Sequence, residues 1–209
     1  MTTGLGGRIK TGYTGGVRRL ATRSMASLAR TRVSPNALTT SGVALCAAAA
    51  VVVYFEYRSE HIAFWVGALL FVIGSVLDIL DGALARSSGR GTPFGAFLDS
   101  TTDRISEGFM LGAIALVFSR DGNLLAVGFA FAAVGGSFLV SYTRARAEAL
   151  GLKGDVGIGS RAERVVVIVT GLVLAPWGAL PWAIYFLTAT AWITVVQRVL
   201  AVRAQLRSG

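Results

Sequence analysis

Long apolar segments alternate with short charged ones along this chain. Uncharged or mostly uncharged segments cover residues 33–55, 62–77, 94–119 and 122–143, and a longer one covers 165–197. A helix needs about 20 residues to cross a bilayer, so the last segment is long enough for two crossings. Pro176 and Pro181 provide a turn between those two. The pattern therefore predicts an all-α membrane protein with six transmembrane helices.

The segment before the first span combines apolar and basic residues. Its apolar positions recur at helical spacing among arginines, at Val17, Leu20, Ala21, Met25 and Leu28. This spacing is typical of an amphipathic helix that lies in the membrane interface, although a disordered basic tail is the alternative. Ser34 can cap the first span, and Pro35 fits its first turn. We expect a basic N-terminal tail and juxtamembrane helix at 1–33, followed by a six-helix domain at 34–209.

Composition and charge agree with a membrane location. The mean hydropathy is +0.64, and only 15% of the residues are charged. Of the 20 lysines and arginines, all but Arg58 and Arg120 fall on one side of the six-span arrangement. The positive-inside rule then places both termini and the acidic loop in the cytoplasm, in a multi-pass protein of the cell membrane. The net charge of +9 reflects this topology and attraction to anionic membrane lipids, so we expect no nucleic-acid partner.

Four of the eleven acidic residues lie close together between the second and third spans. Asp78 and Asp81 are three residues apart at the end of the second span, and Asp99 and Asp103 are four apart at the start of the third. Each pair therefore shares one face of its helix. The connecting segment is short, so we expect the two helices to be antiparallel neighbours whose acidic faces meet. Each charge at bilayer depth costs about 2.5 to 3.5 kcal/mol, so four carboxylates around one point require cations.

An all-oxygen ligand set with no fixed countercharge among the acids favours a hard divalent cation. Mg²⁺ or Mn²⁺ fits this description, and two such ions would make a phosphoryl-transfer site. A metal-ion or proton-coupled transporter also places acids on facing helices, but near mid-membrane, whereas these acids lie near one end. A non-catalytic lipid-binding scaffold is the third alternative.

Small and phosphate-binding residues accompany the acids. Gly82, Ala85 and Gly95 leave volume beside the expected metal site, so that a flat or bulky group can lie against the backbone. Arg86 offers guanidinium donors for a phosphate, and Thr92 caps a helix whose positive N-terminal end faces the same place. These residues indicate a binding site for a phosphorylated ligand.

Eight of these positions form a spaced motif, namely Asp78, Asp81, Gly82, Ala85, Arg86, Gly95, Asp99 and Asp103. It resembles the complete signature of the CDP-alcohol phosphotransferase family. The resemblance implies a homodimer whose site opens to the cytoplasm, with the four aspartates as metal ligands and Asp103 also as the general base. It further implies that the cytidine diphosphate of CDP-diacylglycerol is contacted by Asn36, Ala37, Leu38, Thr39, Gly82, Arg86 and Thr92, with Ala85 and Gly95 in the same CDP-lipid site.

The later segments on the expected cytoplasmic side indicate which molecule accepts the group transferred from the CDP-lipid. Ser141 and Arg144 continue the fourth span inward, Arg164 opens the fifth, and Arg198 lies on the sixth, so these side chains could converge on an anion. The stretch also resembles that of the actinobacterial phosphatidylinositol phosphate synthases, whose acceptor is inositol 1-phosphate. The expected reaction therefore yields phosphatidylinositol phosphate and CMP. Glycerol 3-phosphate and free inositol remain alternative acceptors.

Overall fold

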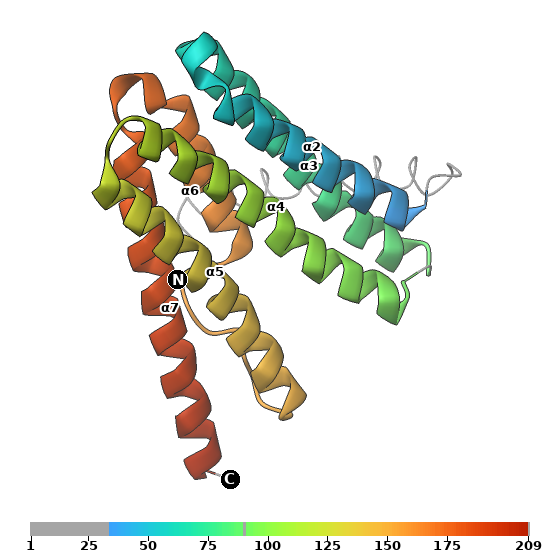
Figure 1. The fold of residues 1–209 in the computed structure, drawn as a ribbon. Coiled ribbons are helices and arrows are strands. Elements are labelled where there is room, and N and C mark those ends of the chain that lie inside the picture. Colours follow the sequence, from blue (N-terminus) through green and yellow to red (C-terminus); the bar gives the residue numbers. More distant parts are fainter. Residues whose placement is uncertain (1–33, 90, 209) are drawn as a thin grey trace, which may run out of the picture.

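The computed structural model describes residues 34–89 and 91–208, and the expected juxtamembrane helix at 1–33 lies outside the described residues. All regular secondary structure in the described part is helical (Figure 1). Its helices are α2 (Pro35–Tyr54), α3 (Glu60–Ser87), α4 (Pro93–Arg120), α5 (Leu124–Ala149), α6 (Arg161–Val173) and α7 (Leu180–Ser208). Two short 3₁₀ helices, η1 (Glu56–Arg58) and η2 (Ala175–Trp177), connect neighbouring helices. The turn predicted around Pro176 is confirmed as η2.

Local capping fixes where three of the helices begin. The Ser34 hydroxyl accepts a hydrogen bond from the Ala37 amide at 3.2 Å, and the Thr92 hydroxyl accepts one from the Gly95 amide at 2.9 Å. Both caps precede a proline in the first turn, as the sequence predicts. Helix α6 begins with a capping box formed by Ser160 and Glu163.

The helices pack in two connected groups. Helix α2 lies along α3 and also packs on α4, while α5 lies along α7 (Figure 1). Helix α4 packs on α5, and α6 packs on both α7 and α3. Direct packing between α3 and α4 is sparse, which differs from the predicted close pair. The reason is that α2 packs against both of them.

A close approach of α2 and α3 lies beside the acidic residues. A Cβ atom added at Gly42 would lie 2.9 Å from the Gly74 carbonyl oxygen, and one added at Gly74 would lie 2.7 Å from the Cys46 sulfur. Small residues allow such contacts between membrane helices. A Cβ at Gly42 would also lie 3.6 Å from the Asp78 amide nitrogen, so the close approach of the two helices includes the backbone of Asp78.

Within residues 34–89 and 91–208, four helices are long and apolar enough to cross a membrane. They are α2, residues His61–Arg86 of α3, α5, and Leu180–Arg207 of α7. Large apolar side chains such as Phe131 and Trp182 are more than 70% exposed on the outer surface, as expected for contact with lipid. Helix α4 is as long as α3 but carries Asp99, Asp103 and Glu107, and α6 has only 13 residues.

Candidate active site

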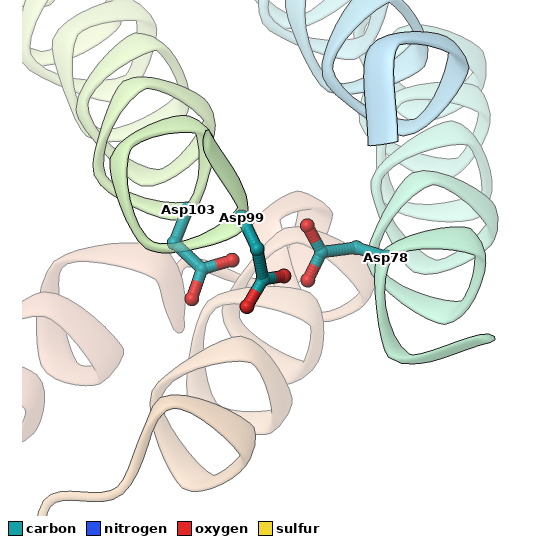
Figure 2. Close-up of side chains that lie close together, drawn as sticks. All are labelled: Asp78, Asp99 and Asp103. Atoms are coloured by element: carbon teal, nitrogen blue, oxygen red, sulfur yellow. The ribbon is translucent and has the colours of Figure 1, made fainter. Parts of the chain in front are cut away.

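Three of the four predicted aspartates meet in the space between α3 and α4. Asp78 on α3 and Asp99 and Asp103 on α4 point toward one another (Figure 2). One oxygen atom from each carboxylate lies within 4.8 Å of the other two. Asp78 is buried, and the two α4 residues are partly buried. These oxygens could hold a divalent cation, because hard cations prefer carboxylate ligands.

Asp81 lies one turn further along α3 and is turned toward α2. One of its oxygens accepts a hydrogen bond from the Thr39 hydroxyl. Its Oδ1 atom is buried and has no hydrogen-bond partner among the described residues. A buried carboxylate oxygen without a partner is costly unless a ligand satisfies it. The donor set of Asp81 together with the three-carboxylate group therefore fits a bound cation.

Arg161 provides a countercharge that the sequence analysis did not find. Its Nη1 atom donates a hydrogen bond to Asp78 Oδ2 and lies 2.8 Å from Asp103 Oδ1. The expectation that the acids lack a fixed countercharge is therefore wrong. Arg161 is the first residue of α6, and the packing of α6 on α3 brings it to the acids. One feature of the sequence could have indicated Arg161 as a site residue. It lies three residues before Arg164, which was predicted to bind the acceptor, and therefore on the same helical face.

A cavity of about 200 Å³ lies between the beginnings of α2 and α4 and the end of α3. Seven residues predicted to bind the CDP-lipid line it, namely Asn36, Thr39, Gly82, Ala85, Arg86, Thr92 and Gly95. Asp81 and Asp99 also line it, whereas Ala37 and Leu38 do not. A Cβ at Gly82 would lie 3.3 Å from the Arg86 guanidinium, and one at Gly95 would lie 3.2 Å from the Thr92 hydroxyl. The two glycines therefore keep this cavity open. We name it the nucleotide cavity.

A second cavity, of about 210 Å³, lies on the α5, α6 and α7 side of the acids. All four residues predicted to bind the acceptor phosphate line it, namely Ser141, Arg144, Arg164 and Arg198. Arg104 and Arg161 add two further cations, against the two acids Asp103 and Asp155. Five arginines against two aspartates make this cavity suited to an anion. We name it the cationic cavity.

Two arginines of the cationic cavity are held rigidly by the protein. The Arg164 guanidinium donates to both carboxylate oxygens of Glu107, at 2.7 and 2.9 Å, and to the Gly159 carbonyl oxygen. Arg198 donates to the carbonyl oxygens of Val156, at 2.8 Å, and Val140. Both guanidiniums are thus fixed before a ligand binds. Glu107 was not identified from the sequence, because nothing local links it to a residue 57 positions away.

We expect Glu107→Ala to destabilise the protein strongly. The Arg164 side chain is only 5% exposed, so loss of its partner leaves a buried charge unpaired. Such a loss costs about 3 to 5 kcal/mol. Thermal unfolding of the purified protein in detergent would measure it. The control is Glu148→Ala, since Glu148 pairs with Arg144 on the surface, where an ion pair contributes about 0 to 1 kcal/mol. Equal shifts for the two variants would contradict the expectation.

Comparisons with known proteins find that the chain is similar to the enzymes of one family. The family model described as CDP-alcohol phosphatidyltransferase matches residues 32–203. The archaetidylinositol phosphate synthase of Pyrococcus horikoshii is 36% identical over 88% of this chain and 90% of its own length. The phosphatidylinositol phosphate synthase of Streptomyces avermitilis is 37% identical over 90% of this chain and 79% of its own.

Solved structures agree with these sequence matches. The crystal structure of the Mycobacterium tuberculosis phosphatidylinositol phosphate synthase with CDP-DAG bound has a TM-score of 0.77 and 31% identity. The match covers 88% of this chain and 94% of that one. A structure of the same enzyme in complex with manganese and citrate has a TM-score of 0.76 and 32% identity, and covers 87% of this chain and 88% of that one.

Proposed function

Since the chain belongs to the CDP-alcohol phosphatidyltransferase family, we propose that it transfers the phosphatidyl group of CDP-diacylglycerol to inositol 1-phosphate. The products are phosphatidylinositol phosphate and CMP. The observation that carries this proposal is the position of the acids between two cavities. Asp81 and Asp99 line the nucleotide cavity, whereas Asp103, one turn after Asp99 on α4, lines the cationic cavity.

The residues around the acids can each take part in the transfer. Arg86 and the beginning of α4 at Thr92 face the nucleotide cavity and can bind the diphosphate of the CDP-lipid. Divalent cations bound by the aspartates would neutralise the charge on that diphosphate. Asp103 would take the proton from the acceptor hydroxyl, whose oxygen then attacks the lipid-bearing phosphorus as CMP leaves. Positioning and charge neutralisation supply most of the rate in such a reaction.

The cationic cavity supports a phosphorylated acceptor. A phosphate dianion there would meet the guanidiniums of Arg164 and Arg198, which are already held in place. A neutral polyol cannot make these charge-assisted hydrogen bonds. The relatives differ in the lipid part of their names, but each is named for an inositol phosphate product. Glycerol 3-phosphate would suit the same cavity charge and is the second candidate acceptor.

The proposal includes an arrangement in the membrane. We propose that α4 and α6 complete a six-span domain at 34–209, which the basic tail and juxtamembrane helix of 1–33 precede. In this arrangement the enzyme lies in the cell membrane as a homodimer, with both termini and the active site facing the cytoplasm. The distribution of lysines and arginines supports this orientation. Two ions of Mg²⁺ or Mn²⁺ would occupy each site, and the manganese complex of the Mycobacterium tuberculosis relative supports divalent ions.

An acceptor panel tests the proposed function. Purified protein is incubated with CDP-diacylglycerol, Mg²⁺ and one acceptor at a time, and CMP release is measured. We expect inositol 1-phosphate to be used and free inositol scarcely at all. Two charge-assisted hydrogen bonds, each worth about 1.5 to 3 kcal/mol, give a preference of roughly 10² to 10⁴-fold.

The panel tests the acceptor assignment and the family reaction separately. Faster turnover of glycerol 3-phosphate or free inositol would overturn the acceptor assignment but leave the CDP-lipid chemistry in place. Absence of CMP release with every acceptor would count against the reaction itself. For substitutions of the cavity arginines, Arg146→Gln is a suitable charge-matched control, because Arg146 is exposed on α5 and lines neither cavity.

A further inference from the structure

Arg161 contacts the three-carboxylate group and also lines the cationic cavity. Its guanidinium bridges Asp78 and Asp103, two members of the three-carboxylate group. The same residue lines the cationic cavity together with Arg164 and Arg198. Its side chain is 26% exposed and is therefore less enclosed than that of Arg164, which is 5% exposed. Its backbone is fixed instead, since it follows the Ser160 cap at the first position of α6.

A divalent cation and the Arg161 guanidinium compete for the same carboxylates. Arg161 contacts Asp78 Oδ2 and Asp103 Oδ1, and both residues belong to the three-carboxylate group that could ligate an ion. Hard cations need direct contact with such oxygens, at roughly 2.0 to 2.6 Å. Two positive groups at this spacing also repel each other. A bound ion therefore displaces the guanidinium from at least one of these carboxylates.

The displaced side chain can turn into the cationic cavity, which Arg161 already lines. Arg104, Arg164 and Arg198 occupy the same cavity, so an additional cation is unfavourable there by itself. A phosphate dianion reverses this balance, because it accepts bidentate hydrogen bonds from guanidinium groups. Arg161 can therefore donate hydrogen bonds to the acceptor phosphate only after its guanidinium has left the carboxylates.

We propose that Arg161 exchanges between two positions, and that this exchange couples metal binding to acceptor binding. Without metal, Arg161 neutralises Asp78 and Asp103. With metal bound, it turns into the cationic cavity and donates to the phosphate of the acceptor. This inference rests on the proposed function, since it assumes a divalent ion at the aspartates and a phosphate ester in the cavity. Coupling of this kind is reciprocal, so each ligand strengthens the binding of the other.

The test compares binding of inositol 1-phosphate to wild type, Arg161→Gln and the control Arg146→Gln, by calorimetry in detergent with and without Mn²⁺. In the Mn²⁺-loaded protein, Arg161→Gln should weaken binding by roughly 10- to 150-fold, the value of one charge-assisted hydrogen bond. Without Mn²⁺ it should leave binding unchanged, because Arg161 is then engaged with the acids. Arg161→Gln should also bind Mn²⁺ more tightly than wild type, since the competing guanidinium is gone. Arg146→Gln should match wild type in every measurement.

Two results would overturn the inference. One is an equal loss of inositol 1-phosphate affinity with and without Mn²⁺, which would make Arg161 a permanent part of the cavity. The other is Mn²⁺ affinity in Arg161→Gln that equals or falls below that of wild type, as a purely structural role predicts. If Arg161→Gln does not fold, Arg161→Lys replaces it, because lysine keeps the charge but loses the bidentate contact. Wild-type turnover in the acceptor panel separates failure of this inference from failure of the proposed function.

Discussion

Removal of divalent cations is expected to abolish CMP release. The carboxylates of Asp78, Asp99 and Asp103 lie within one ion's reach, and Asp81 has a buried oxygen without a partner among the described residues. Arg161 bridges two of these acids, and Arg104 lies 3.6 Å from Asp103, so two guanidiniums face four carboxylates. The diphosphate of a CDP-lipid would add further negative charge at this place. Arginine alone cannot balance that charge, whereas divalent ions can.

The measurement is CMP release from purified protein in excess chelator, followed by addition of Mg²⁺ or Mn²⁺ in excess over the chelator. We expect activity to disappear in the first step and to return in the second. The control sample receives chelator that was saturated with Mg²⁺ beforehand, so that ionic strength and detergent are the same. Undiminished release in excess free chelator would rule out a metal-dependent reaction.

Local features of the site could be predicted because short-range rules govern them. The caps at Ser34 and Thr92 follow from the capping preference of hydroxyl residues before a proline, and the structure confirms both. The shared helical face of Asp99 and Asp103 follows from helical periodicity. The cluster of arginines in the cationic cavity was also predicted, because basic residues at the expected cytoplasmic ends of three predicted spans would lie on the same side of the protein.

Features that depend on how the helices pack could not be predicted in this way. Arg161 meets Asp78 across 83 positions, and Arg164 meets Glu107 across 57. Helical periodicity defines the faces of α3, but it does not tell which neighbour each face meets. Asp81 contacts Thr39 on α2, while Asp78 faces α4 across the gap. The prediction of a close α3 and α4 pair omitted α2, which packs on both.

Asp103→Asn is expected to abolish turnover while most CDP-lipid binding remains. Asp103 lines the cationic cavity, where the acceptor hydroxyl would bind, and is not among the residues that line the nucleotide cavity. An asparagine has almost the same shape but cannot accept the proton. Loss of a general base alone lowers the rate by roughly 10² to 10⁴-fold, and loss of a metal ligand adds to this. Turnover is followed by CMP release, and binding by calorimetry with CDP-diacylglycerol in the presence of Mn²⁺.

The matched comparison for this variant is Asp99→Asn, one turn earlier on the same helix. Asp99 belongs to the same three-carboxylate group but lines the nucleotide cavity. We therefore expect Asp99→Asn to lose both turnover and CDP-lipid binding, because the ion that would neutralise the diphosphate is held less well. The two variants remove the same charge from the same cluster, so a difference in binding between them reports which cavity each aspartate serves. Equal loss of CDP-lipid binding in both would mean that Asp103 acts chiefly as a metal ligand, and the base would then have to be another group.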